Sequence, residues 1–177
     1  MRILKLIIIL FLTFSCSQKE TDKRIVEFES ILGKRKTSAL NLLVSDFDKN
    51  LNRIYPDLET SQAYLKFLTD IKNNNITDWN EYKFQSKETN LEYKKSGLRS
   101  EIYVEKNTEL EPNYAGKYSI AMGKLKDSDY LIKGYYEIRE AVSGMIRPDL
   151  FASEILSSNP DFSDYFHKRI VVLEFSF

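Results

Sequence analysis

The sequence has little of several residues on which common sites depend. Its 177 residues include one cysteine, one histidine, one tryptophan, six glycines and four prolines. One cysteine cannot form an internal disulfide or a Cys-x-x-Cys metal site, and one histidine excludes a zinc site built from histidines alone. The scattered glycines form no phosphate-binding loop of the Gly-x-x-x-x-Gly-Lys type. With 26 basic and 26 acidic residues, the chain lacks the basic excess typical of nucleic-acid-binding proteins.

The remaining composition favours one helical domain. Glycine and proline together are about half as frequent as the ~12% found in average proteins, so the chain has few natural breaks and long helices are favoured. Hydrophobic residues make up 42% of the chain, which is too many for a disordered polypeptide. The length suits a single domain.

Residues 1–15 have the pattern of a signal peptide. Two cations, Arg2 and Lys5, precede an apolar run from Leu6 to Phe14 that only Thr13 interrupts. This run is shorter than the ~20 residues needed to span a bilayer, and its length is typical of the apolar part of a secretory signal. We expect this segment to be cleaved from the mature protein.

Cys16, the only cysteine, directly follows this segment. The arrangement resembles the bacterial lipoprotein signal, in which the cysteine after the cleavage point becomes the lipid-carrying N-terminus. This resemblance implies a membrane anchor and a place in the cell envelope, and Ser17 resembles lipoproteins sent to the outer rather than the inner membrane. Residues 16–24 are polar and are expected to form a flexible tether. An ordinary secretory signal and a short buried N-terminal helix are the alternatives.

A second resemblance covers the C-terminal part of the chain. It rests on the stretch from Pro112 to Tyr118, on Arg139-Glu140-Ala141 and on residues 159–169. These segments resemble uncharacterised lipoproteins of the Bacteroidetes type, which carry no assigned activity. The resemblance therefore implies a location and no chemistry.

Residues 25–177 are predicted to form one helical domain. Apolar residues recur at steps of three and four over Leu40–Ile54, which predicts a helix with one face toward a core. Pro56 ends this helix, and Asp57 is the expected N-cap of a second, antiparallel helix. Residues 73–75, three asparagines, end the second helix.

The rest of the domain is predicted to be helical as well. A helix is favoured over a strand for residues 98–104, and residues 109–113 are expected to be a loop. Residues 170–177 are left open between helix and strand, because their β-branched run suits a sheet. In total we expect an all-α domain of about six or seven helices packed as antiparallel hairpins. The expected starts of the later helices are Thr77-Asp78, Asp127-Ser128, Pro148 and Asn159-Pro160.

His167 and Asp164 are the first catalytic candidates that the pattern offers. In Asp161-x-x-Asp164-x-x-His167, a helix would place Asp164 and His167 on one face. Such a pair can orient a general base or supply two metal ligands; an ion pair near a helix start is the simpler interpretation. Neither Gly-x-Ser-x-Gly nor His-Glu-x-x-His is present. We expect no metal and no cofactor.

An acidic pair, Glu137 and Glu140, lies one helical turn apart. A diiron site needs Glu-x-x-His from two helices, and the single histidine cannot supply both. Arg139, between these acids in sequence, is instead expected to form interhelical ion pairs.

Tyrosine is abundant, with 11 residues. Tyr114, Tyr118 and Tyr135 are the candidates for a binding surface, since tyrosine is enriched at protein interfaces and its ring can stack on a sugar. The alternative is that they line the core with their hydroxyl groups reaching water.

These observations lead to a functional expectation. The protein is expected to be a membrane-anchored, non-enzymatic binding or accessory module, whose partners are the membrane, through the N-terminal lipid, and another envelope protein or surface component. No nucleic-acid partner is expected. An envelope hydrolase or metal-dependent enzyme using His167 with Asp164 is one alternative, and an immunity or inhibitor protein is another.

Overall fold

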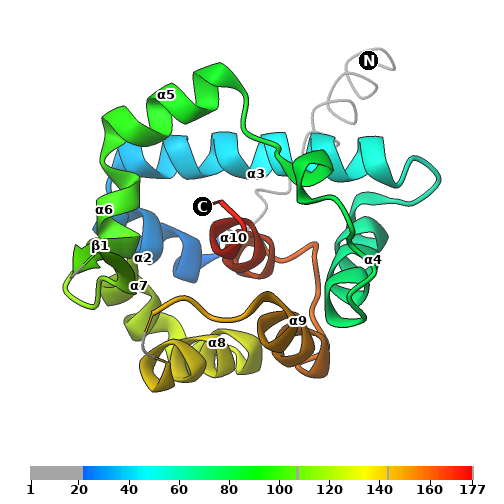
Figure 1. Ribbon diagram of the computed structural model, residues 1–177. Coiled ribbons are helices and arrows are strands. Elements are labelled where there is room, and N and C mark those ends of the chain that lie inside the picture. Colours follow the sequence, from blue (N-terminus) through cyan, green and yellow to red (C-terminus); the bar gives the residue numbers. More distant parts are fainter. Residues whose placement is uncertain (1–21, 107, 143, 177) are drawn as a thin grey trace, which may run out of the picture.

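The computed structural model describes residues 22–106, 108–142 and 144–176. These residues form a single, mainly helical domain with one two-stranded antiparallel sheet (Figure 1), which confirms the predicted fold class. In chain order the elements are α2 (Lys23–Leu32), α3 (Lys34–Ile54), α4 (Thr60–Lys72), the 3-10 helix η1 (Trp79–Tyr82), α5 (Lys87–Ser96), α6 (Leu98–Ile102), β1 (Tyr103–Lys106), β2 (Glu109–Pro112), α7 (Lys117–Leu125), the 3-10 helix η2 (Lys126–Ser128), α8 (Tyr130–Ala141), α9 (Pro148–Ser157) and α10 (Tyr165–Glu174).

The last helix, α10, lies at the centre of the molecule. Figure 1 shows it nearly end-on, with α3 on one side and α8 and α9 on the other. All four residues over 170–173 are completely buried, so packing from several sides outweighs the sheet preference of their β-branched side chains. The open question about residues 170–177 is thus decided in favour of a helix that ends at Glu174.

The domain begins slightly earlier than predicted. Asp22 caps α2, and Lys23 and Arg24 form its first turn, although both were assigned to the tether. Cys16 and the predicted signal peptide lie outside the described residues. Across the parts of the chain that are described, no helix has both the length and the apolar character needed to cross a membrane.

The helix pair around Pro56 is confirmed in its ends but not in its cap. α3 ends at Ile54, before the proline, and α4 ends at Lys72, before the asparagines. α4 starts only at Thr60, with Glu59 at the cap position, so the prediction of Asp57 as the N-cap is wrong. α4 packs most extensively against α9.

The middle of the chain departs most from expectation. Gly97 adopts a left-handed conformation, with φ of 72°, and ends α5. Residues 98–104 are then divided, because the helix continues to Ile102 and a strand begins at Tyr103. The loop predicted for residues 109–113 is wrong, since Glu109–Pro112 pairs with the preceding strand as β2. The helix expected from Asp78 is only the short η1.

Two further N-caps lie downstream of their predicted positions. Asp129, rather than Asp127-Ser128, caps α8, and Asp164, rather than Asn159-Pro160, caps α10. Asn159 has a positive φ of 50° and lies in the loop before that helix. A cap is decided by which side-chain oxygen reaches the first free backbone N–H groups, and several nearby polar residues compete for that role. Pro148 is confirmed at the first turn of α9.

Candidate functional site

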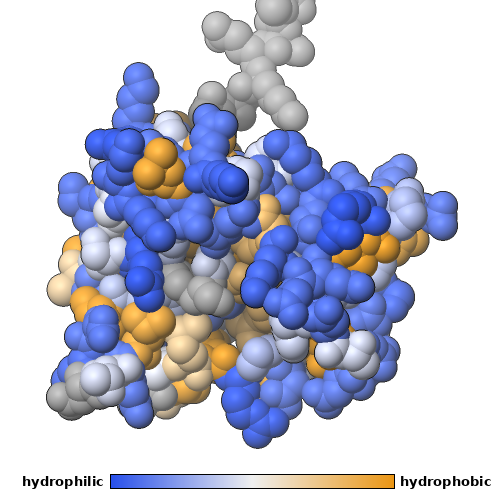
Figure 2. All heavy atoms as spheres, turned by 45° about the horizontal axis from the view of Figure 1, so that its top comes forward, coloured by the Kyte–Doolittle hydropathy of each residue, from blue (hydrophilic) through white to orange (hydrophobic). Residues whose placement is uncertain are grey.

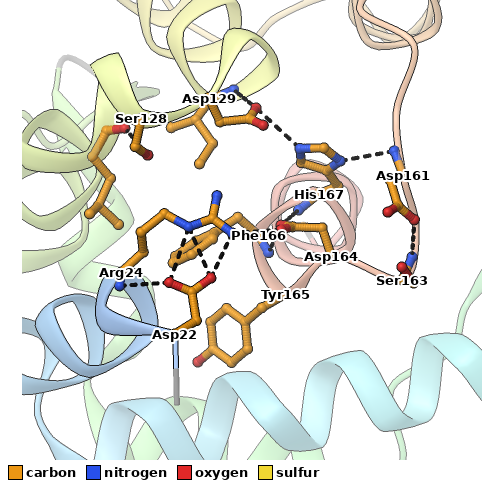
Figure 3. A network of polar contacts seen from close by, with 12 residues as sticks. Asp22, Arg24, Ser128, Asp129, Asp161, Ser163, Asp164, Tyr165, Phe166 and His167 are labelled. Atoms are coloured by element: carbon orange, nitrogen blue, oxygen red, sulfur yellow. Dashed lines mark hydrogen bonds and ion pairs between the residues drawn. The ribbon is translucent and has the colours of Figure 1, made fainter. Parts of the chain in front are cut away.

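Three aspartates cap helices whose N-terminal ends meet around His167 (Figure 3). Asp22 begins α2, Asp129 begins α8 and Asp164 begins α10. Each carboxylate accepts a backbone N–H from the first turn of its helix, at 2.8 Å for Asp22 and Asp129 and 2.7 Å for Asp164. Such contacts satisfy the free N–H groups and place negative charge at the positive end of the helix dipole. Sequence analysis identified only the last of these three caps as a candidate residue.

Arg24 joins two of the caps. Its Nη2 group donates to Asp22 Oδ2 at 2.6 Å and to Asp164 Oδ2 at 2.9 Å, and its guanidinium lies over the Phe166 ring, 5.3 Å from the centroid. The hydrogen bond from Arg24 lowers the pKa of Asp22. The start of α2 is therefore tied to the start of α10.

His167 joins the third cap through its ring. Nδ1 accepts a hydrogen bond from the Asp161 backbone N–H at 3.0 Å, so the ring proton belongs on Nε2, which lies 3.1 Å from Asp129 Oδ1 and donates to it. Burial opposes the charge on Asp129, but hydrogen bonds from the Ile132 backbone and from His167 lower its pKa. The imidazole side chain is only 8% exposed.

We call Asp22, Arg24, Asp129, Asp164 and His167 the N-cap network. The predicted neighbours Asp164 and His167 do touch, but through the His167 backbone N–H at 3.3 Å and not through the ring. The ring faces Asp129 from another helix, which sequence spacing could not reveal. Both ring nitrogens and both Asp164 oxygens have bonding partners in the fold, so proton transfer through His167 would first require one of these bonds to break.

An open groove borders the network, with a volume of about 790 Å³. Its wall includes Lys168, which pairs with Asp48 at 2.9 Å, and Arg169, whose guanidinium lies 3.2 Å from the centroid of the Tyr165 ring. Burial lowers the pKa of Arg169. The groove thus presents both signs of charge, and no single ionic ligand is indicated.

The three candidate tyrosines do not form one exposed surface. Tyr118 and Tyr135 are each 1% exposed, whereas Tyr114 is 48% exposed. The Tyr135 hydroxyl donates to Glu174 Oε1 at 2.7 Å, and the Tyr114 hydroxyl donates to the backbone carbonyl of Arg139. Tyr118 and Tyr135 are therefore core residues, and the proposal of a shared binding face for all three is corrected.

The core contains a buried ion pair beside these rings. Arg139 Nη1 on α8 lies 2.8 Å from Glu174 Oε1 on α10, and both side chains are nearly inaccessible to solvent. Arg139 Nη2 also donates to the Ile102 carbonyl at 3.2 Å, next to β1. The expectation of an interhelical ion pair for Arg139 is confirmed. The Tyr103 hydroxyl of β1 also donates to Glu174 Oε2 at 3.2 Å, so the pair connects the end of α6 and the start of β1 to two core helices.

Two surface features bear on what the described residues could bind. Within them, no group of three or more His, Cys, Asp or Glu side chains is placed to hold a metal ion. Figure 2 shows hydrophobic residues on this face in separate small groups among hydrophilic ones. The exposed large hydrophobic residues include Val26, Leu65, Trp79, Leu91, Val104, Tyr114, Ile120, Tyr130, Met145 and Leu150.

Comparisons were made with protein-family models, with curated proteins and with solved structures. None of the three finds a match to this chain.

Proposed function

We propose that this protein is an envelope lipoprotein, anchored through Cys16, that acts as a non-enzymatic binding module for another envelope protein or surface component. The observation that carries the proposal is the hydrogen bonding of His167 and Asp164. The side chains of these two catalytic candidates are engaged in hydrogen bonds that connect the N-terminal ends of three helices.

The proposed anchor limits how far the domain can lie from the membrane. Cys16 and Asp22 are six positions apart, so the chain between them can extend over about 20 Å at most. The N-cap network and the groove beside it, both of which include Asp22, would then lie close to the membrane.

The anchor is tested by Cys16→Ser in a bacterium with an outer membrane. We expect the wild-type protein to fractionate with membranes and its mature N-terminal peptide to carry a diacylglycerol mass, and the variant to lose both properties. A bare thiol on membrane-free, mature wild-type protein contradicts the anchor.

The absence of catalysis is tested by His167→Asn in the anchored protein. The change should lower the melting temperature, because the Asp161 N–H and Asp129 lose a shared partner, yet hydrolysis of envelope substrates by purified protein should be absent in both forms. A hydrolytic activity of the wild type that disappears in the variant, while Arg24→Lys retains it, would favour the hydrolase alternative and end the binding-module proposal.

A further inference from the structure

A small cleft opens on the part of the surface formed by α4, η1 and α9, away from the N-cap network. Its volume is about 210 Å³, which is below the ~300–1,000 Å³ of pockets that take drug-sized ligands. It shares no lining residue with the groove that borders the N-cap network. We call it the Trp79 cleft, and it is lined by Ile71, Asn74, Ile76, Trp79, Pro148 and Asp149.

The apolar part of the cleft is an exposed indole held in place from behind. Trp79 is 45% exposed, and its ring lies nearly parallel to that of Phe175, at an angle of 17° and a centroid distance of 6.1 Å. Tyr82 packs beside it at 6.2 Å. Ring contacts of this kind limit the motion of the indole, so little ordering remains to be done when a ligand covers it.

The polar part of the cleft consists of an amide and an ion pair. Asn74 is exposed, and its backbone has a φ of 55°, a left-handed conformation that asparagine tolerates better than most residues. Its amide offers both a donor and an acceptor. Asp149 forms a two-point contact with Arg147, at 3.1 and 2.6 Å, and a carboxylate can accept more than one hydrogen bond on each oxygen.

We propose that the Trp79 cleft binds one pyranose ring of an uncharged envelope or cell-surface saccharide. The ring C–H groups of a sugar carry partial positive charge and pack on the negative face of an indole, while its hydroxyl groups match the Asn74 amide and the Asp149 carboxylate. The charged side chains at the cleft neutralise each other, so a neutral ligand is favoured over an ion. The inference rests on the proposed binding function and names its ligand class.

The size of the cleft favours a sugar ring over an extended peptide. A peptide bound along a groove needs a run of pockets or a free strand edge, and the Trp79 cleft provides space for a single ring. A partner's proline or aliphatic side chain remains the competing occupant. It would use Trp79, Ile76 and Pro148 but would leave the amide of Asn74 without a role.

Trp79 is the only tryptophan in the chain, so its fluorescence reports on the cleft directly. The mature, lipidated protein in detergent is titrated with methyl β-glucoside, methyl β-galactoside, methyl α-mannoside and N-acetylglucosamine. We expect a saturable change in emission with at least one of them, with a Kd on the order of 1 mM or tighter. The Kd should hardly change between low and high salt, because no net charge is involved.

Two variants and one control separate the roles of the cleft. Asn74→Gly tolerates the left-handed backbone and removes the side chain that carries the amide, so it should weaken binding about fivefold, the factor expected for one neutral hydrogen bond. Trp79→Ala, followed by calorimetry instead of fluorescence, should abolish measurable binding. Tyr130→Ala removes another exposed aromatic ring, which does not line the cleft, and should leave the Kd unchanged. Circular dichroism checks that each variant is folded.

The results distinguish this inference from the function on which it rests. No saturable response to any of the four sugars, or binding that Asn74→Gly and Trp79→Ala leave intact, overturns the inference. A response only to a proline-containing peptide, unaffected by Asn74→Gly, assigns the cleft to a protein partner and also overturns it, while the binding function survives. Hydrolysis of a bound glycoside would end the non-enzymatic proposal and leave the sugar site standing.

Discussion

The buried ion pair between Arg139 and Glu174 gives the most demanding test of the fold. Glu174→Gln keeps the size of the side chain and removes its charge, which leaves the Arg139 guanidinium inside the core, 5% exposed, without its counter-ion. Burial alone would lower the pKa of Arg139, but the facing oxygens of Tyr135 and Glu174 outweigh burial and raise it, so the arginine stays charged. Removal of one partner from a buried pair costs about 3–5 kcal/mol.

We expect the lower end of this range, about 3 kcal/mol, because glutamine can still accept hydrogen bonds from Arg139 and Tyr135. For a domain of this size each kcal/mol changes the melting temperature by roughly 2–4 °C, so Glu174→Gln should lower it by about 6–12 °C. Calorimetry and urea unfolding followed by circular dichroism measure the effect.

Glu140→Gln is the matched control, since it makes the same chemical change at an exposed position of α8. It should alter the free energy of unfolding by less than about 0.5 kcal/mol. The double variant Arg139→Met, Glu174→Gln should lose less stability than the sum of the two single variants, because the second change removes the uncompensated charge. Equal effects of Glu174→Gln and Glu140→Gln would refute the reasoning.

Two further predictions concern acid stability and backbone shape. Burial opposes the charge on Asp70, but hydrogen bonds, led by the one from Lys66, lower its pKa. Asp70 therefore stabilises the fold fully above its unfolded pKa of about 3.9, and this contribution is lost as the pH falls through the lower, folded value. In urea unfolding measured at a series of pH values, the free energy of unfolding of Asp70→Asn should fall less steeply below about pH 4 than that of the wild type. An equally steep fall in both proteins speaks against this contribution. In α8, Gly134→Ala should raise the free energy of unfolding by about 0.5–1 kcal/mol, because an added Cβ meets only ordinary contacts, the nearest at 3.6 Å. Gly116→Ala should instead lower it by about 2–3 kcal/mol, since a Cβ there would lie 2.1 Å from the Glu101 carbonyl oxygen. If urea unfolding showed that both alanine variants change the free energy of unfolding in the same direction, this result would contradict the close approach of residue 116 to the Glu101 carbonyl.

Helix ends marked by proline or by a run of asparagine were predictable, whereas most N-caps were not, and only Asp78, which caps η1, lies where it was expected. Pro56 and Pro148 restrict the backbone itself, whatever surrounds them, and both act where expected. Asp57 and Asn159 are good cap residues by type, yet the helices begin farther along the chain. The position of a cap depends on where packing lets the first helical turn form, and this is not a local property.

The candidate site also combines residues that the sequence could indicate with contacts that only the packed structure shows. His167 could be singled out because it is the only histidine, and Asp164 because of its spacing. The residue that receives the ring proton of His167 is Asp129, 38 positions away, and no pattern in the sequence connects the two. Tyr118 and Tyr135 likewise have the spacing of a helix face, but only the packed structure shows that this face is turned into the core.

The sequence by itself determined the helical class of this protein, because apolar spacing and scarce glycine and proline act through local backbone preferences and hydrophobic burial. The tertiary structure alone decided which polar and charged groups from distant elements meet, since Arg24, Arg139 and His167 each bond to a residue on another helix. The physical reason is that burying a polar or charged group is favourable only where a partner of matching geometry is present, and that partner is supplied by the packing of whole helices.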